Sequence, residues 1–535
     1  MLQRSGLLTL LSAVLFPLAL PNELFPLGSP VLGLVALAPY YIALCETPDA
    51  KHASRLGALF GGVSTLIANY WLMFFGDYSI WTIGGTTIGY IGYNYVLAGF
   101  LRRATRAPRA YRPMLFALVW TLYEYLKSVG FLGYPWGLAA YPFNTLVIYT
   151  QFADVTGVWG LSLIAVYANA TVAELVRSPV RLRPAHFSLA LRNLALVFVM
   201  IAGVAVYGSI RLSDEIPIRD TVDVVMIQQN ADSWARGNFS RPLLTAQRET
   251  VRALAAIDRE PELIIWSETS LRYYYEQSRG WYASNPQELP FITFVSELPA
   301  PLLTGAPFQD PEDDYAVYNA SILIGRDTEI DQWYGKRHLV PFAEAIPFWE
   351  TAAVRRFFQD VVGISGVWTP GNENRLFEIV GNAETPVHFA TPICFEDGFA
   401  YVNRRFVHAG ADLIVNLTNN SWSRTDSAQL QHLVAARYRA IETRRGLVRS
   451  TNSGFTAVLD PWGRVEESIP MFETGHLVAT VPVYEPETET VYMMLGDYLP
   501  YLIGVILAVL FVAAEVRKRA PNGALLLESV GDAMT

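Results

Sequence analysis

Hydrophobic residues in this chain follow two different patterns. Up to about residue 210, and again near residue 500, long apolar stretches alternate with short polar segments. A helix needs roughly 20 apolar residues, with about 17 as the lower end, to cross a bilayer. The pattern therefore predicts a multi-span α-helical membrane domain, with eight helices at residues 7–20, 27–45, 56–75, 81–101, 113–131, 158–176, 194–210 and 498–514.

The first apolar stretch is short and has a second interpretation. It contains Pro17 and follows Arg4, which also fits the core of a signal peptide. No small-residue cleavage pattern follows Leu20. A retained first helix is therefore the favoured prediction, with the signal peptide as its alternative.

Basic residues in the short loops set the predicted orientation, because cytoplasmic loops carry an excess of Lys and Arg. We predict eight crossings with both termini in the cytoplasm. This arrangement places most basic loop residues on the cytoplasmic side, namely Arg4, Lys51, Arg55, Arg102, Arg103, Arg106, Arg109, Arg112, Arg177, Arg181, Arg183, Arg192, Arg517, Lys518 and Arg519. The opposite short loops hold little that is basic beyond Lys127. The predicted units are a membrane domain with seven helices at 1–212, an extracytoplasmic domain at 220–485, an eighth helix at 495–516 and a cytoplasmic tail at 517–535.

Polar residues within the predicted membrane helices have two readings. Asn94, Glu124 and Asn169 lie in apolar stretches, and intramembrane polar groups are costly and often functional. The alternative interpretation is that they form hydrogen bonds between helices, and we favour this alternative for each of the three residues. Glu124 and Lys127 lie near the outer end of the fifth helix, where a second interpretation is that water solvates both side chains. The Gly-, Pro- and aromatic-rich residues 133–145 are typical of an interfacial loop or the floor of a lipid-facing site.

Between residues 220 and 485 the pattern changes to short β-branched runs with helical segments between some of them. The runs are residues 222–228, 263–266, 302–306, 318–324, 387–393 and 412–418. From Ser427 to Arg445, apolar residues recur on one helical face, and Gly446 is a plausible C-cap. Alternating buried strands and helices predict an α/β layered domain.

Composition supports this division and excludes one class of function. Hydrophobic residues make up 52% of the 535 residues and charged residues only 17%, and the net charge of −9 comes largely from the second region. The arginine clusters fall between apolar segments, where the orientation rule explains them, so nothing predicts nucleic-acid binding. The two cysteines, Cys45 and Cys394, lie in different regions, which leaves no partner for a disulfide in the extramembrane part.

Cys394 lies where the run at 387–393 ends, directly before Phe395, Glu396 and Asp397. A buried structural cysteine is the common alternative, but strand ends are where catalytic side chains concentrate. A thiol nucleophile needs a base or a cation nearby, and no histidine forms a recognisable pair with Cys394. Glu268 lies just beyond the run at 263–266 and Lys336 lies ahead of a Pro-bearing loop, and together they supply both groups. Glu268 can take the thiol proton, Cys394 can attack a carbonyl and Lys336 can stabilise the oxyanion.

In this order the three stretches resemble the carbon–nitrogen hydrolase (nitrilase) superfamily. With membrane helices on both sides, the full length resembles the apolipoprotein N-acyltransferase family. Further matching motifs are ADSWAR with Trp234, FAEAIP with Glu344, CFED with Glu396, NNSW ending at Trp422, and residues 437–463. The resemblance implies an α/β nitrilase-like domain, an α-β-β-α sandwich, on the extracytoplasmic side of a bacterial inner membrane.

The resemblance also implies an activity. An acyl chain passes from a phospholipid, usually phosphatidylethanolamine, to a cysteine thioester and then to the α-amino group of the diacylglyceryl-cysteine of an apolipoprotein. It assigns Glu268 as general base, Lys336 as oxyanion stabiliser and Cys394 as nucleophile. Glu344 matches a second essential glutamate and Trp234 a substrate-handling tryptophan, and Glu396, Phe395 and Trp422 match supporting positions. Neither a metal nor an organic cofactor is implied.

Three residues depart from the family pattern, and two other functions compete with the one implied. Ser267 replaces a proline, Phe395 a tyrosine and Asn420 an aspartate, which bears on substrate preference more than on activity. A membrane-anchored amidase or nitrilase acting on small C–N substrates would use the same three residues but needs only one helix. A transporter or sensor with an inactive ligand-binding domain would not need to keep all three.

Overall fold

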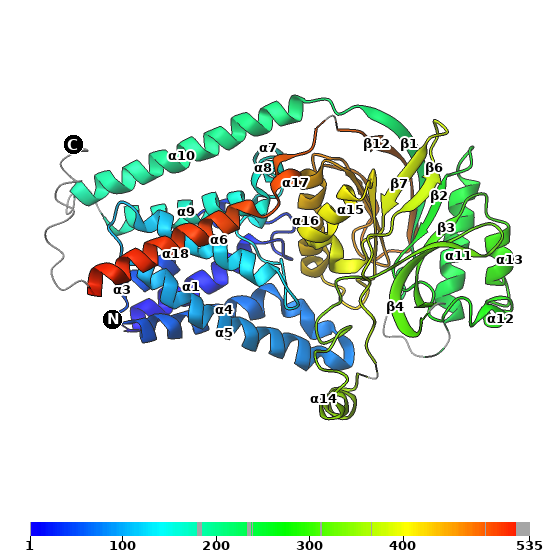
Figure 1. The fold of residues 1–535 in the computed structure, drawn as a ribbon, viewed down its shortest axis with the longest axis horizontal. Helices are drawn as coiled ribbons and strands as arrows, with labels where there is room; N and C mark the ends of the chain where they lie inside the picture. The colour runs from blue at the N-terminus through cyan, green and yellow to red at the C-terminus, as the bar shows by residue number, and fades with distance from the viewer. Residues whose placement is uncertain are drawn as a thin grey trace.

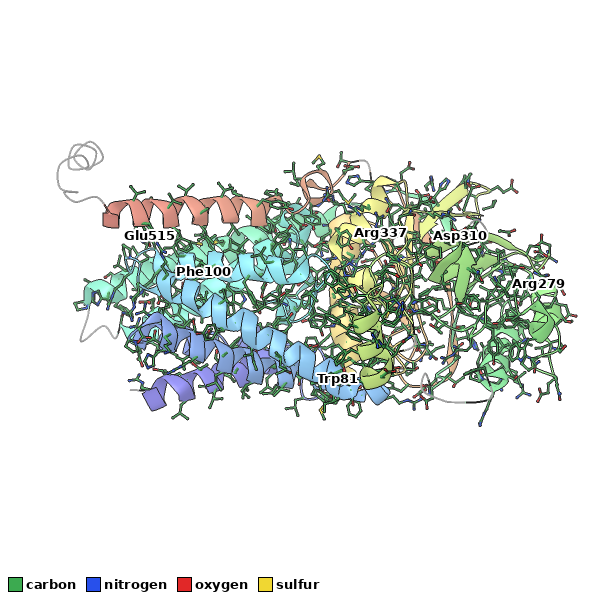
Figure 2. The ribbon with its side chains drawn as sticks, turned by 60° about the horizontal axis from the view of Figure 1, so that its bottom comes forward. Trp81, Phe100, Arg279, Asp310, Arg337 and Glu515 are labelled. Atoms are coloured by element: carbon green, nitrogen blue, oxygen red, sulfur yellow. The ribbon has the colours of Figure 1, made fainter. Side chains whose placement is uncertain are left out.

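The computed structural model describes residues 2–178, 184–232, 237, 239–310, 313–364, 366–486 and 488–519. In Figure 1 a bundle of roughly parallel helices occupies one side and two sheets with their covering helices occupy the other. Figure 2 shows the same division, with Phe100 and Glu515 among the long helices and Arg279 at the far end of the sheets. Near the junction, the rings of Trp81 and Phe357 are in contact, with centroids 6.2 Å apart.

The helical part combines the first half of the chain with one helix from its end. Its α-helices are α1 (Leu2–Ala19), α2 (Pro30–Gly33), α3 (Ala38–Glu46), α4 (Ala50–Ala68), α5 (Ser79–Thr105), α6 (Arg112–Ser128), α7 (Val147–Thr150), α8 (Ala153–Thr156), α9 (Val158–Arg177), α10 (Pro184–Ser213) and α18 (Tyr498–Arg519). Short 3₁₀ turns lie at Tyr70–Phe74, Gly76–Tyr78 and Tyr141–Phe143.

Within the described residues, three helices are long and apolar enough to cross a membrane, namely α9, α10 and α18. The stretch predicted as one helix at 27–45 is not continuous, because α2 ends at Gly33 and α3 begins at Ala38. Pro39 lies at the start of α3, where a missing N–H costs no helical hydrogen bond. The number of crossings therefore stays a prediction.

Glycines bring α4 and α5 close together. A Cβ atom on Gly57 would lie 2.1 Å from the carbonyl oxygen of Asn94, and one on Gly61 would lie 2.4 Å from that of Tyr90. The two glycines are four residues apart, so they lie on one face of α4. This spacing allows the close backbone approach that holds helices together where the hydrophobic effect is weak.

The second part contains two six-stranded mixed sheets. The first has the order β12-β1-β2-β3-β4-β5 and the second β11-β10-β9-β8-β7-β6. The strands of the first sheet are β1 (Ile218–Gln228), β2 (Leu263–Trp266), β3 (Leu302–Asp310), β4 (Asp313–Ile324), β5 (Ile330–Gly335) and β12 (Gly475–Tyr484). Those of the second are β6 (Phe377–Val380), β7 (Pro386–Ala390), β8 (Leu413–Thr418), β9 (Gly446–Thr451), β10 (Ala457–Leu459) and β11 (Val465–Ser468).

Alternate residues of each strand face opposite ways, which makes four layers. Val224 of β1 packs with Val415 of β8 in the core between the sheets. Its neighbour Val225 packs on the other face, under the helices of the first sheet. These outer helices and the remaining ones are α11 (Ser240–Ala255), α12 (Arg279–Tyr282), α13 (Phe291–Ser296), α14 (Ala352–Phe357), α15 (Ala400–His408), α16 (Asp426–Thr443) and α17 (Val491–Leu495). The predicted α-β-β-α sandwich is confirmed.

Helix α16 joins the two parts and is buried on nearly every face. Leu433 packs on the second sheet beside Leu447, whereas Tyr438 packs against residues of the long helices. Two local predictions are corrected here. The helix ends at Thr443, and Arg444 rather than Gly446 adopts the left-handed conformation, with φ of 52°. The strand predicted at 387–393 ends at Ala390.

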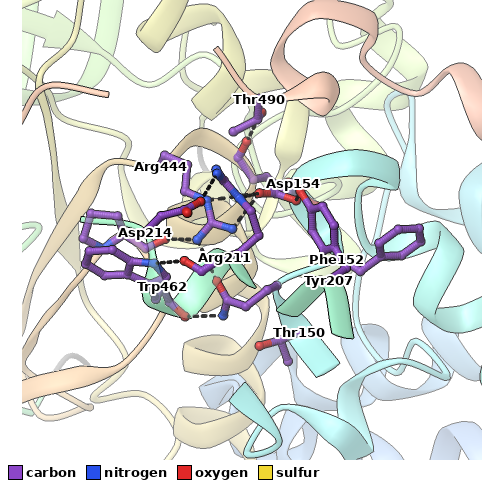
Figure 3. Close-up of polar contacts among 12 residues, drawn as sticks. Thr150, Phe152, Asp154, Tyr207, Arg211, Asp214, Arg444, Trp462 and Thr490 are labelled. Carbon is purple, nitrogen blue, oxygen red and sulfur yellow. Dashed lines mark hydrogen bonds and ion pairs between the residues drawn. The ribbon is translucent and has the colours of Figure 1, made fainter. Parts of the chain in front are cut away.

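A buried ion-pair network explains why an arginine takes the capping position (Figure 3). The Arg444 guanidinium donates to Asp154 Oδ2 at 2.6 Å, and both side chains are almost fully buried. Arg211, near the end of α10, donates to the same oxygen at 2.9 Å. The Tyr207 hydroxyl donates to the other oxygen at 2.7 Å. Asp154 thus joins α8, α10 and the turn after α16.

We expect Asp154→Asn to lower the free energy of unfolding by roughly 3–5 kcal/mol, because it leaves the buried Arg444 without a counter-charge. Equilibrium unfolding of the full chain in detergent measures this change. Asp214→Asn is the matched control, since Asp214 also pairs with Arg211 but its side chain is 41% exposed. A loss under about 1 kcal/mol is expected there. Equal losses in the two variants would contradict the role of the Asp154 network.

Candidate active site

Three loops bring the predicted catalytic side chains together at the ends of strands. Glu268 follows β2, Lys336 follows β5, and Cys394 opens the 3₁₀ turn Cys394–Gly398 after β7. The Lys336 ammonium lies 3.5 Å from Glu268 Oε1 and 2.8 Å from Glu344 Oε1. The thiol of Cys394 lies within the electrostatic reach of the same charges. Side chains from separate loops, spread between residues 268 and 394, therefore form one cluster.

The position of Glu268 is fixed by both of its oxygens. Oε1 accepts a hydrogen bond from the Asn319 side chain at 2.9 Å, and Oε2 accepts one from the backbone N–H of Asn419 at 2.8 Å. The backbone behind it is equally constrained. A Cβ atom on Gly305 of β3 would lie 2.5 Å from the Glu268 Cα, so only glycine fits at that point. Glu268 is thus a buried carboxyl group held in a fixed position, as a general base requires.

Lys336 is buried with two carboxylates beside it. Burial alone would lower its pKa, but the charges of Glu344 and Glu268 outweigh burial and raise it above the ordinary lysine value. The ammonium therefore stays charged throughout the physiological range. Asn319 holds both carboxylates, because its side-chain amide also donates to Glu344 Oε1 at 3.1 Å. The second Glu344 oxygen accepts the N–H of Val340 at 2.8 Å.

Cys394 is half-buried and has an unusual backbone conformation. Its φ is 54°, in the left-handed region that costs a non-glycine residue energy and is concentrated at functional sites. The Asn416 side chain holds this turn by donating to the carbonyl oxygens of Pro392 and Cys394 at 2.9 and 3.0 Å. Burial first, and then the charge of Glu268, raises the pKa of the thiol well above its usual value. The thiol therefore keeps its proton until a base removes it.

Glu396 links the lysine loop to the cysteine loop. One of its oxygens accepts the N–H groups of Arg337 and His338 at 2.9 and 2.8 Å, and the other accepts that of Ile393 at 2.7 Å. The Tyr334 hydroxyl also donates to the first of these oxygens, at 3.1 Å. Burial raises the pKa of Glu396 to about 7. The carboxyl thus holds residues beside Lys336 and Cys394 at a fixed separation.

A second buried network lies behind the cysteine turn. His432 of α16 and Arg449 of β9 contact the two oxygens of Asp397 at 2.7 and 2.9 Å. Burial opposes ionisation, but these two side chains outweigh it and lower the pKa of Asp397. An ionised Asp397 therefore ties the turn to the second sheet and to α16. Within the described ranges, no group of three or more His, Cys, Asp or Glu residues is placed to hold a metal ion.

Aromatic residues connect this site to the long helices. The Phe395 ring packs on Trp136, with centroids 6.4 Å apart, and also lies under the Lys336 ammonium. Trp422 contacts Trp71 and Phe75, with centroids 5.7 and 4.9 Å away. The residue next to the thiol therefore faces the helical part. Trp234 lies outside the described residues.

Comparison with known proteins decides the family. A model described as the apolipoprotein N-acyltransferase N-terminal domain matches residues 12–171, and a carbon-nitrogen hydrolase model matches residues 224–485. "Apolipoprotein N-acyltransferase 2" of Treponema denticola is 36% identical over 502 residues, covering 93% of this chain and 95% of that protein. The chain belongs to the apolipoprotein N-acyltransferase family.

Other relatives give the same result. "Apolipoprotein N-acyltransferase 2" of Treponema pallidum is 38% identical, covering 95% of this chain and 93% of that protein. "Apolipoprotein N-acyltransferase" of Borreliella burgdorferi is 32% identical, with 92% of each chain covered. The predicted resemblance is confirmed. This chain is thus an acyltransferase enzyme, which favours acyl transfer over the amidase alternative.

The departures from the apolipoprotein N-acyltransferase pattern have distinct surroundings. Ser267 is fully buried, with its hydroxyl 3.3 Å from that of Ser270, so it faces other protein groups. Asn420 lies 3.3 Å from His432, the residue that contacts Asp397. Phe395 contributes an aromatic face to Lys336 and needs no hydroxyl for that contact.

Sequence reasoning missed several polar residues of this apolipoprotein N-acyltransferase site. Asn319 lies in a strand run, where Asn319-Ala320-Ser321 resembles a glycosylation triplet, yet its side chain holds two active-site carboxylates. Asn416 similarly lies in a run of hydrophobic residues. A buried amide in a strand needs a hydrogen-bonding partner, and that requirement was the available signal.

Proposed function

We propose that this enzyme transfers a fatty acyl chain from a phospholipid to the α-amino group of the diacylglyceryl-cysteine of apolipoproteins, through a thioester on Cys394. The observation that carries the proposal is the placement of a half-buried thiol within reach of the charges of Glu268, Lys336 and Glu344. Such a cluster supplies a nucleophile, a base and an oxyanion-stabilising cation.

In the first half-reaction, Glu268 takes the thiol proton as the sulfur attacks the ester carbonyl of the phospholipid. The carbonyl oxygen becomes an oxyanion beside the Lys336 ammonium. When the tetrahedral intermediate collapses, the C–O bond to the lysophospholipid breaks, and Glu268 returns its proton to the leaving alkoxide. The acyl chain remains on Cys394 as a thioester, and Glu268 is again ionised.

In the second half-reaction, the neutral α-amino group of the acceptor attacks the thioester carbon. A second oxyanion forms at the same carbon, again beside Lys336, while Glu268 accepts a proton from the amine. Breaking of the C–S bond releases the amide, and the proton on Glu268 returns to the thiolate. Glu344 keeps the lysine charged and in place, and Asn319 keeps the two carboxylates apart.

Attachment to a membrane suits this chemistry. Both substrates carry their acyl chains in a bilayer, and extraction costs about 0.8 kcal/mol per CH₂ group. The proposed arrangement has eight membrane helices in a bacterial inner membrane, with both termini in the cytoplasm and the nitrilase-like domain on the periplasmic side. The contact of Phe395 with Trp136 supports a site that faces the helices, where lipid limits access of water to the thioester.

Labelling tests the proposed topology. A cysteine introduced at Asn285 should react with a membrane-impermeant thiol reagent added outside intact spheroplasts. One at Arg106 should react only after the membrane is opened. The parent chain, which keeps its two native cysteines, gives the background. Labelling of both positions from the same side would contradict the arrangement.

The proposed function is tested by following the mass of the enzyme in a single turnover. With phospholipid alone, the protein should gain one acyl group. That mass should disappear when a diacylglyceryl-cysteine peptide is added, and the peptide should gain it. If the peptide is acylated only when both substrates are present and no acyl-enzyme forms at any time, the thioester route is wrong. Release of the acyl group to water in place of transfer would instead favour a hydrolase.

A further inference from the structure

A cavity lies among the long helices, one aromatic layer from the active site. It is lined by residues from α1, α4, α5 and α6, by the loop at 134–137 and by Gln431 of α16. Trp136, whose ring packs on Phe395 and on His432, forms part of its wall. Tyr90 and Tyr134 also line the cavity and are only half-buried. The cavity is therefore distinct from the thiol cluster but borders it.

Two buried acceptor oxygens on its lining residues have no partner among the described residues. Glu124 is 1% exposed, and its Oε1 accepts the Trp120 indole N–H and the Ala139 N–H at 2.8 Å each; the Ser162 hydroxyl also interacts with this carboxyl, but Oε2 accepts no hydrogen bond of ordinary length. Asn94 donates its amide to the Tyr90 carbonyl and the Tyr123 hydroxyl, while its Oδ1 accepts nothing. Buried polar groups are normally satisfied, so these two indicate a missing donor.

Asn169 provides the contrast within the same bundle. Its Oδ1 accepts the Leu37 N–H at 2.8 Å, and its amide donates to the carbonyls of Gly33 and Ala165. The bonds to Leu37 and Gly33 are the contacts between segments that were predicted for Asn169, and with the bond to Ala165 within α9 they account for all of its polar atoms. Hydrogen bonding between helices does not account for one oxygen of Glu124 and one of Asn94. The prediction that water solvates Glu124 is wrong, because its side chain is buried.

Lys127 lies at the same cavity but does not neutralise Glu124 by direct contact. Its ammonium donates to the carbonyl oxygens of Tyr134 and Trp136 and lies over the Tyr90 ring at 5.7 Å. Among the described residues, no ion pair joins it to Glu124. One of its three N–H donors remains for an anionic group. The cavity thus presents acceptor oxygens beside one available cationic donor, with aromatic faces around them.

We propose that this cavity is a substrate subsite for a primary ammonium group, which donates to Glu124 Oε2 and Asn94 Oδ1. The inference rests on the proposed function, because the acceptor of that reaction carries such a group and so does the donor when it is an ethanolamine phospholipid. One is the head group of an ethanolamine phospholipid, whose phosphate would then face Lys127. The other is the α-ammonium of the acceptor before it loses its proton. A quaternary ammonium has no N–H to donate and fits the two oxygens poorly, whereas aromatic faces favour either cation.

The test uses Glu124→Gln in the full chain, because this change keeps the shape but replaces an acceptor oxygen with a donor. Binding is measured by native mass spectrometry on the Cys394→Ala background, with phosphatidylethanolamine or phosphatidylcholine of identical chains as probes. The unmodified cavity should retain phosphatidylethanolamine preferentially. Glu124→Gln should weaken its retention about ten- to hundredfold, as expected for a lost charge-assisted hydrogen bond, and leave phosphatidylcholine unchanged.

A second arm identifies the source of the ammonium group. The diacylglyceryl-cysteine peptide, with and without N-acetylation, is the alternative probe on the same two proteins. If Glu124→Gln weakens binding of the free-amine peptide alone, the site belongs to the acceptor. If it weakens binding of phosphatidylethanolamine alone, the site belongs to the donor. Because binding is read without turnover, failure of the proposed transfer reaction does not affect this result.

Two further variants separate recognition from folding. Thr121→Val alters a buried hydroxyl of α6 that does not line the cavity, and it should leave every probe unaffected. Asn94→Asp adds charge at similar volume and should strengthen retention of the amine-bearing probe, which keeps the test decisive if Glu124→Gln does not fold. Unchanged retention of both amine-bearing probes in Glu124→Gln or Asn94→Asp, or equal weakening of all probes, would overturn the proposal.

Discussion

Replacing Cys394 with alanine is expected to abolish the acyl-enzyme and with it all transfer to the acceptor. The proposed route makes the sulfur both the attacking atom and the leaving group, and the chain contains one other cysteine, Cys45 of α3. The charged groups that act on the thiol are carboxylates and an ammonium, and none of them supplies a second thiol or hydroxyl nucleophile. Intact-mass measurement after incubation with phospholipid should show only the unmodified protein.

The control for this prediction is Cys45→Ala. Cys45 is buried in the helical core and packs as a small hydrophobic residue, so its loss should leave acylation and transfer within about twofold of the parent. The Cys394→Ala protein should also still bind phospholipid, since the change removes one atom from the site. Acylation of Cys394→Ala at the parental rate would assign the nucleophile to another residue.

Replacing Lys336 with methionine is expected to slow both half-reactions by roughly 10²–10³-fold, the usual effect of losing one oxyanion contact. The reason is that each half-reaction passes through an oxyanion at the same carbon. The ammonium is preorganised for that charge, since Glu344 and Glu268 hold it at 2.8 and 3.5 Å. Single-turnover rates of acylation by phospholipid, and of transfer from acyl-enzyme prepared with that variant, measure the two halves separately.

Loss of this lysine also leaves two buried carboxylates without a cation, so folding must be separated from catalysis. The double variant Lys336→Met/Glu344→Gln removes one of these charges and should recover stability while staying slow in both half-reactions. Arg326→Met changes an exposed cation at the tip of the hairpin between β4 and β5 and should leave the rates unaffected. A defect confined to one half-reaction would show that Lys336 positions a substrate and does not stabilise both oxyanions.

Local patterns in the sequence predicted the strands β1, β2, β3, β4, β7 and β8 and nominated the candidate site residues, but they missed β5, β6 and the strands from β9 onward. The strand runs are recognisable because a strand buried on both faces is a short β-branched segment. Glu268 and Cys394 follow two of those runs, whereas β5, which leads into Lys336, was not predicted; the structure brings Glu268 and Lys336 within 3.5 Å of each other. Motif order supplied Glu344 and Glu396 as well, although it could not show that Glu344 is the nearer partner of the lysine.

Other features depend on contacts between distant segments, which no local pattern contains. Asn319 becomes a site residue only because β4 places its amide between Glu268 and Glu344. Arg444 ends α16 in place of the expected Gly446 because Asp154, about 290 residues earlier, supplies a buried counter-charge. In both cases the stabilising interaction joins elements that meet only after folding.

Sequence alone determined that this protein has apolar helices flanking an α/β sandwich with a Glu–Lys–Cys set, because hydrophobic periodicity and motif order are local properties. Tertiary structure decided where α2 and α3 separate, which polar groups are satisfied and which are not. It shows Asn169 fully hydrogen-bonded but leaves an oxygen of Glu124 unpaired at a cavity. The two residues are alike in sequence, as single polar residues in apolar helices. They differ in which donors from other segments reach them, and that depends on how the helices pack.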